Sequence, residues 1–114
     1  IRSRGLGDVY KRQVLRYVAP KINCPMIVTE NGIGTDDDNQ RIKYITTALK
    51  GLQSCLDDGL DIRGYYYWSF LDNFEWIYGY KPRFGLIEVN RDTLERKSKE
   101  SLKFYEQIIR NSQS

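Results

Sequence analysis

The stretch Met26–Gly34, MIVTENGIG, runs a β-branched apolar segment directly into a glutamate and a turn signal. Residues 25–29 (PMIVT) predict a short buried strand, because short apolar runs bounded by turn residues are typical of strands in parallel sheets. Glu30 follows this predicted strand, and Asn31-Gly32 is a common turn pair. By itself, a glutamate in this position fits an exposed loop as well as it fits a functional site.

Helical and strand-like patterns alternate on both sides of this stretch. Residues 14–22 (VLRYVAPKI) predict the end of a helix, and residues 36–39 offer N-cap candidates for the next one. That next helix has one apolar face, with spacings of three and four residues, formed by Ile42, Ile45, Leu49, Leu52 and Leu56. The run Asp57-Asp58-Gly59 is expected to end it.

A second strand is predicted at residues 62–70 (IRGYYYWSF), which are aromatic and almost free of charge. A polar and aromatic loop follows, and then a short strand at residues 86–90 (LIEVN). A last helix is predicted to begin near Ser98 and to bury Leu102, Tyr105, Ile108 and Ile109. This order predicts an α/β fold with a parallel βαβ unit, which takes roughly 30 residues or more. Two strands cannot be covered on both faces by so short a chain, so it is expected to be part of a larger α/β protein.

The composition is that of a globular protein, since 40% of the 114 residues are hydrophobic and 29% are charged. No apolar run approaches the roughly 18 residues of a membrane-spanning helix, so no membrane partner is expected. Nothing at the start resembles a secretory signal. The chain begins at Ile1 and its only methionine is Met26, which indicates a fragment or a processed product.

The net charge of +3 comes from the first thirteen residues, IRSRGLGDVYKRQ. They hold four basic residues and one acidic residue, whereas 14 basic and 14 acidic residues balance each other from Val14 onward. Because this segment has no apolar periodicity, residues 1–13 are expected to be a non-native or disordered prefix, with a native solvated tail as the alternative. Residues 14–114 lack the clustered basic surface of a nucleic-acid binder.

Cysteine and histidine restrict the chemistry further. Cys24 and Cys55 belong to no CxxC motif, and free buried thiols are expected rather than a disulfide. Free thiols favour the cytoplasm, and the compartment is otherwise unknown. The chain contains no histidine, which removes the commonest metal ligand and the commonest general base. Chemistry is therefore expected to rest on carboxylates without a metal or cofactor, and the oligomeric state stays unknown.

Carboxylates and aromatic residues gather where the two predicted strands end. Glu30 follows the first strand, and the second leads to Trp68, Asp72, Glu75 and Trp76. Ligands of parallel α/β proteins bind at the carboxyl ends of the strands. A carboxylate among aromatic side chains suits the oxocarbenium-like transition state of glycoside hydrolysis. Taken singly, Glu75 is more typical of a solvated loop than of a functional site, and the two tryptophans are more typical of core packing.

Together, these motifs resemble glycoside hydrolase family 1, the β-glucosidase and β-galactosidase group. IVTENG (residues 27–32) looks like the nucleophile motif at the end of the family's seventh barrel strand. Residues 64–89 (GYYYWSFLDNFEWIYGYKPRFGLIEV) look like its eighth strand and sugar-binding loop, and residues 95–109 (ERKSKESLKFYEQII) resemble its closing segment. The resemblance covers residues 14–112. It implies that the chain is the C-terminal part, the last two βα units, of a (β/α)8 TIM barrel.

The resemblance also implies a role for each site residue. Glu30 matches the nucleophile that forms a covalent glycosyl-enzyme in a retaining mechanism. Trp68 matches the aromatic platform beneath the sugar, Glu75 the carboxylate that grips two sugar hydroxyls, and Trp76 a neighbour that contacts another hydroxyl. Phe84 matches an aromatic residue that lines the same pocket.

The surrounding residues and the substrate follow from the same resemblance. Asn31 and Gly32 are expected to shape the turn, and Asp72 and Asn73 to brace the loop. Because Glu75 would repel a phosphate, an unphosphorylated β-glucoside, β-galactoside or oligosaccharide is expected. The Asn-Glu-Pro motif that carries the family's acid/base is absent from this sequence, so the isolated chain is expected to be inactive. The alternative is a non-catalytic carbohydrate-binding or decayed fragment.

Overall fold

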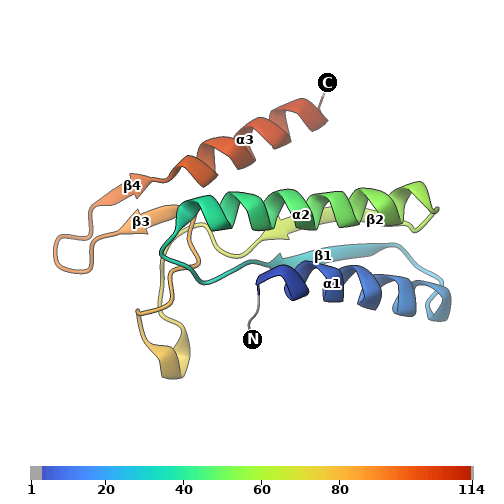
Figure 1. Cartoon of the computed structure of the whole chain (residues 1–114), viewed down its shortest axis with the longest axis horizontal. Coiled ribbons are helices and arrows are strands. Elements are labelled where there is room, and N and C mark those ends of the chain that lie inside the picture. The colour runs from blue at the N-terminus through green and yellow to red at the C-terminus, as the bar shows by residue number, and fades with distance from the viewer. Residues whose placement is uncertain (1–3, 114) are drawn as a thin grey trace. The chain divides into compact units, whose positions relative to one another are not determined.

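The computed structural model describes the backbone of residues 4–113 and the side chains of residues 11–113. Figure 1 shows its elements, which are α1 (Arg4–Val18), η1 (Ala19–Lys21), β1 (Met26–Asn31), α2 (Asp38–Asp57), β2 (Ile62–Tyr67), η2 (Trp76–Tyr78), β3 (Ile87–Val89), β4 (Arg96–Ser98) and α3 (Glu100–Ser112). The chain divides into two compact units. The first comprises the chain up to residue 31 together with residues 43–67, and the second comprises residues 32–42 and the chain from residue 68 onward.

The first unit is the βαβ unit that the alternating sequence pattern predicts. Strands β1 and β2 lie side by side and parallel (Figure 1), with Val28 opposite Tyr65 and Asn31 opposite Tyr67. Both helices and both strands contribute to its core, which consists of Leu15, Met26, Val28, Cys55 and Ile62. Removal of these apolar side chains from water stabilises the unit by roughly 25 cal/mol for each Å² buried.

The strands of this unit are buried on one face only within the described residues, as expected for a chain too short to cover a parallel sheet on both faces. Ile27 on β1 is 55% exposed and Tyr66 on β2 is 61% exposed. The core side chains of α1 and α2 cover one face, and parallel sheets need covering elements on both. The strand ends differ from prediction, because β1 extends to Asn31 and β2 ends at Tyr67, before the predicted end at Phe70.

The second unit contains a short antiparallel hairpin in which β3 pairs with β4. The pairing places Ile87 opposite Ser98, and the side chain of Asn90 accepts backbone hydrogen bonds in the connecting turn. Strand β4 was not predicted, because the residues Arg96-Lys97-Ser98 show no apolar alternation. Its side chains are all exposed, so this strand forms through backbone pairing with β3.

The two long predicted helices are confirmed, although the last one buries different residues. In α2, Ile45 is completely buried, as the apolar spacing predicts, whereas Leu56 of the same apolar face is 39% exposed. In α3, Ser101 is the buried residue, and Ile109 is 43% exposed instead of buried. The other three predicted core residues of α3 are half-buried: Leu102, Tyr105 and Ile108. The apolar face of α3 is therefore incompletely covered by the described residues.

Helix α1 begins at Arg4 and includes residues 4–13 of the predicted prefix. The interpretation of residues 1–13 as a non-native prefix stays a prediction. Cys55 is a buried free thiol as expected, but Cys24 lies exposed before β1, so the expectation is wrong for that residue. None of the described helices is both long and apolar enough to cross a membrane.

Candidate active site

Glu30 lies in β1, one residue before the end of the strand. The pairing of β1 with β2 is irregular between Val28 and Asn31. Such an irregularity redirects side chains, and here it leaves Glu30 exposed while Asn31 is buried. Among the described residues, the Glu30 carboxylate has no hydrogen bond or ion pair, and no cluster of His, Cys, Asp and Glu could hold a metal ion.

Asn31 is anchored in the first unit by two tyrosine hydroxyls. Its Nδ2 donates to the hydroxyl of Tyr44 at 3.0 Å, and the hydroxyl of Tyr65 donates to its Oδ1 at 2.8 Å. Asn31 is buried, so both ends of its amide are satisfied where water is excluded. Asn31 therefore lies within the strand and not in a turn, and its side chain holds the strand end that carries Glu30. No sequence spacing links the two tyrosines to Asn31, since they come from α2 and β2.

Glu30 belongs to the first unit, whereas the four predicted sugar-binding residues belong to the second. Within the second unit, the structure brings Trp68 and Glu75 together, because the indole Nε1 donates to Glu75 Oε2 at 3.3 Å. The backbone N–H of Glu75 donates to the carbonyl of Gly79 at 2.7 Å and closes a tight turn around η2. This turn fixes the backbone from which Glu75 and Trp76 project.

Trp76 is the most exposed aromatic residue of this turn, at 81%. Its φ of 50° lies in the left-handed region, which costs a residue with a Cβ roughly 1–2 kcal/mol. Strain of this kind gathers at functional sites. The Phe74 ring meets Trp76 edge-on at 6.2 Å and Tyr80 at 5.4 Å, while the guanidinium of Arg91 lies 4.6 Å from the Tyr80 ring. The contacts of the Phe74 ring with Trp76 and Tyr80, together with the contact of Arg91 with Tyr80, thus support the strained turn.

Phe84 is held from two directions in the second unit. Its ring packs on Gly34, where an added Cβ would lie 2.9 Å from Phe84 Cε2. The preceding carbonyl, that of Arg83, accepts hydrogen bonds from the Thr35 N–H at 3.0 Å and from the guanidinium of Arg41. A Cβ at position 34 would therefore push against the ring, which would have to shift to make room for it.

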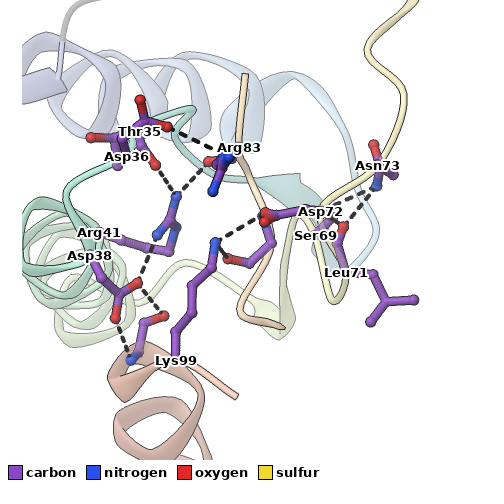
Figure 2. A network of polar contacts seen from close by, with 12 residues as sticks. Thr35, Asp36, Asp38, Arg41, Ser69, Leu71, Asp72, Asn73, Arg83 and Lys99 are labelled. Carbon is purple, nitrogen blue, oxygen red and sulfur yellow. Dashed lines mark hydrogen bonds and ion pairs between the residues drawn. The ribbon is translucent and has the colours of Figure 1, made fainter. Parts of the chain in front are cut away.

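Arg41 is the centre of a polar network that Figure 2 shows. Its guanidinium donates to Asp38 Oδ1 at 2.7 Å and to the Thr35 carbonyl at 2.6 Å, although the side chain is only 1% exposed. Asp38 also accepts hydrogen bonds from the Ser101 N–H at 2.9 Å and the Ser101 hydroxyl at 2.7 Å. Burial raises the pKa of Asp38, but the hydrogen bonds from Ser101 and Arg41 outweigh burial and lower it. The spacing of Asp38 and Arg41 resembles an ordinary surface pair of a helix, so sequence analysis missed this network.

The expectation that Asp72 and Asn73 brace the loop is confirmed. Asp72 Oδ1 accepts a hydrogen bond from the Gly85 N–H at 2.9 Å and forms an ion pair with Lys99 at 3.0 Å (Figure 2). Asn73 Nδ2 donates to the Leu71 carbonyl at 3.0 Å. Burial lowers the pKa of Lys99, even though the Asp72 carboxylate opposes that change.

Known proteins resemble this chain in both sequence and structure. The sequence model of glycosyl hydrolase family 1 matches residues 4–114. Beta-glucosidase A of Acetivibrio thermocellus is 40% identical over 121 residues, which cover 98% of this chain and 26% of that protein. Beta-galactosidase of Pyrococcus woesei is 41% identical over 95 residues, covering 82% of this chain and 19% of that protein. The crystal structure of a GH1 beta-glucosidase from Exiguobacterium antarcticum B7 matches with a TM-score of 0.88 and 36% identity, over 96% of this chain and 28% of that chain.

The chain spans roughly a fifth to a quarter of the length of the proteins that it matches. The structural likeness confirms the predicted fold class, in which the two strand–helix units are the last two βα units of a (β/α)8 TIM barrel. The family match includes residues 4–13, which the sequence motifs leave out. This chain belongs to glycosyl hydrolase family 1.

Proposed function

We propose that the protein containing this chain is a retaining β-glycosidase that hydrolyses β-linked glucosides or galactosides. The family and the names of the beta-glucosidase and beta-galactosidase relatives support this class of activity. The observation that carries the proposal is the presentation of Glu30, an exposed carboxylate beside the anchored Asn31. The active sites of (β/α)8 barrels lie at the carboxyl ends of the strands, where Glu30 is found.

Glu30 is assigned the role of nucleophile. Its carboxylate attacks the anomeric carbon as the glycosidic bond breaks, which gives a covalent glycosyl-enzyme that water then hydrolyses. The leaving oxygen takes a proton from a second carboxylic acid, which retaining enzymes hold roughly 5–5.5 Å from the nucleophile. Glu75 is assigned to sugar binding, and its carboxylate already accepts a hydrogen bond from Trp68. Because the acid/base motif is absent from the sequence, we expect the 114-residue chain alone to be inactive.

The substrate is proposed to be a neutral β-glycoside or oligosaccharide. The indole of Trp68 offers an apolar face to the sugar ring, and Glu75 accepts hydrogen bonds from sugar hydroxyls. One oxygen of Glu75 binds the Trp68 indole, which orients the carboxylate before substrate arrives. The negative charge of Glu75 disfavours a phosphorylated sugar in the same place. Trp76 is assigned to a contact with a further sugar hydroxyl, and Phe84 to the lining of the same sugar pocket.

The test uses a barrel chimera, in which residues 14–114 replace the matching part of Beta-glucosidase A from Acetivibrio thermocellus. We expect the barrel chimera to hydrolyse an aryl β-glucoside. A 2-deoxy-2-fluoro glucoside with a good leaving group should leave its sugar attached to Glu30, because fluorine slows the breakdown of the covalent intermediate. Mass spectrometry of the proteolytic peptides locates the labelled carboxylate.

Matched variants separate the nucleophile from an ordinary glutamate. Glu30→Gln should lower kcat by roughly 10⁴-fold or more, as the loss of a nucleophile does in other enzymes. Glu88→Gln, on the exposed side of β3, is the control and should keep activity. A label on another carboxylate, or full turnover by Glu30→Gln, contradicts the assignment. If the 114-residue chain alone hydrolyses the substrate and Glu30→Gln abolishes this activity, the expected inactivity of the isolated chain is contradicted.

A further inference from the structure

Lys99 lies between β4 and α3, outside the predicted sugar-binding segment. Its side chain is 13% exposed, and its Nζ binds Asp72 Oδ1 at 3.0 Å (Figure 2). The same Nζ donates to the Gly85 carbonyl at 2.8 Å, while Asp72 Oδ1 also accepts the Gly85 N–H at 2.9 Å. A single ammonium therefore joins two positions that are distant in the sequence. We refer to residues 72–85 as the sugar loop.

We infer that Lys99 is a positioning residue for substrate binding and acts by holding both ends of the sugar loop. Asp72 is three residues before Glu75, and Gly85 directly follows Phe84. Holding these two ends restricts the backbone freedom of the residues between them, which the sugar would otherwise have to order on binding. This inference rests on the proposed function, because Glu75 and Phe84 bind substrate only in that proposal.

Asp72 depends on Lys99 for compensation of its charge. The Asp72 side chain is 9% exposed, and its Oδ2 is buried without a hydrogen-bond partner among the described residues. Its other oxygen, Oδ1, therefore accepts hydrogen bonds from both the Lys99 ammonium and the Gly85 N–H. A buried carboxylate without its cation is strongly unfavourable. Removal of the Lys99 charge should therefore drive Asp72 toward water and release the start of the sugar loop.

A purely structural role, in which Lys99 only attaches α3, can be separated from this one. Helix α3 has an independent attachment through Ser101, which makes two hydrogen bonds to Asp38. That contact involves neither end of the sugar loop. We therefore expect α3 to stay attached when Lys99 loses its charge, so that the sugar loop alone responds.

The first test is amide hydrogen exchange, followed by NMR in the 114-residue chain, and it requires no activity. The reporters are the N–H groups of Glu75 and Gly79, which donate to carbonyls within the sugar loop at 2.7 and 2.9 Å. Lys99→Met keeps the apolar stem and removes the charge, and it should lower the protection of these amides by roughly tenfold or more. The amides of α3 should keep their protection.

The control is Lys103→Met, which removes an exposed cation of α3 that pairs with Glu100. This variant should change neither the sugar loop nor α3. An equal loss of protection in the sugar loop and in α3 after Lys99→Met indicates a purely structural role and overturns the inference. Unchanged protection of the sugar loop also overturns it.

The second test measures kinetics in the barrel chimera. Lys99→Met should raise KM for an aryl β-glucoside by roughly tenfold with a smaller change in kcat, because it disorders groups that bind the sugar. In an Asp72→Asn background, Lys99→Met should add little, since the charge that Lys99 compensates is gone. Independent effects of the two substitutions overturn the inference. If the unsubstituted chimera is inactive, the proposed function fails, whereas hydrogen exchange still decides the role of Lys99.

Discussion

Removing the hydroxyl of Tyr65 tests the anchor that presents Glu30. Tyr65→Phe keeps the ring that packs against the core of the first unit. It removes the O–H that donates to Asn31 Oδ1 at 2.8 Å. Asn31 is only 8% exposed, so bulk water does not replace the missing donor.

The expected magnitude follows from the difference between losing a hydrogen bond and leaving a buried group unsatisfied. A neutral hydrogen bond contributes about 1 kcal/mol net, whereas an unsatisfied buried acceptor costs about 1–3 kcal/mol. The bond from Asn31 Nδ2 to Tyr44 at 3.0 Å remains and keeps the amide partly oriented. We therefore expect the free energy of opening the end of β1 to fall by about 1–3 kcal/mol, roughly 5- to 150-fold in the equilibrium.

The assay is amide hydrogen exchange of the 114-residue chain, read at the amides of β1. Tyr17→Phe is the matched control, because it removes a tyrosine hydroxyl from a residue of α1 that is 69% exposed. Surface substitutions of this kind change stability by less than about 0.5 kcal/mol. If Tyr65→Phe changes the protection of β1 as little as Tyr17→Phe does, the Asn31 anchor does not hold the strand.

The same substitution has a catalytic consequence in the barrel chimera. A displacement of a reacting group by about 1 Å can lower the rate roughly 10²-fold. We expect Tyr65→Phe to lower kcat, since the released strand end lets the Glu30 carboxylate move. Faster exchange in β1 with an unchanged kcat would refute the link between Asn31 and the position of Glu30.

Three further predictions concern glycine contacts, acid stability and the core. Gly85→Ala should destabilise the second unit by roughly 1–3 kcal/mol or more in urea unfolding, because the new Cβ would collide with the backbone nitrogen of Asp72. Gly34→Ala should cost less, since the Phe84 ring can move aside, and equal costs would contradict this difference. The pKa of Asp38 is lowered in the fold, so its contribution to stability is present above the unfolded pKa of about 3.9 and is lost as the pH falls through the lower folded value. As the pH falls below about 4, the Asp38→Asn variant should therefore lose less stability than the unsubstituted chain. Acid unfolding curves that run parallel for the two proteins would contradict this role of the Asp38 carboxylate. Ile45→Ala removes a side chain that is 0% exposed and should cost about 2–5 kcal/mol, measured by circular dichroism in urea, whereas a cost below 1 kcal/mol would indicate that the core around α2 is loosely packed.

Elements with a strong side-chain pattern could be predicted from the sequence. The apolar spacing from Ile42 to Leu56 predicts α2, since a helix returns to the same face every three or four residues. The apolar runs before Glu30 and Trp68 likewise predict β1 and β2, and their separation predicts a parallel pair. The predicted site residues also follow from local motifs. Their assignment to catalysis and sugar binding stays a prediction.

Elements without such a pattern required the tertiary structure. Strand β4 consists of charged and polar residues, and its pairing with β3 is made by backbone groups that every residue carries. The exposed half of α3 has a similar cause, because an amphipathic pattern shows which side chains can be buried but not whether a neighbour covers them. Ile109 was therefore predicted to be buried and is exposed.

The contacts that support the candidate site were the least predictable from sequence. Glu30 could be singled out from its own motif, but the partners of Asn31 come from α2 and β2. In the same way, Lys99 meets Asp72 across 27 positions of the chain. Such contacts leave no periodic signal, because they depend on where folded segments meet. The sequence by itself determined the residue types of the site and the order of its main elements, whereas only the tertiary structure decided which distant side chains hold them in place.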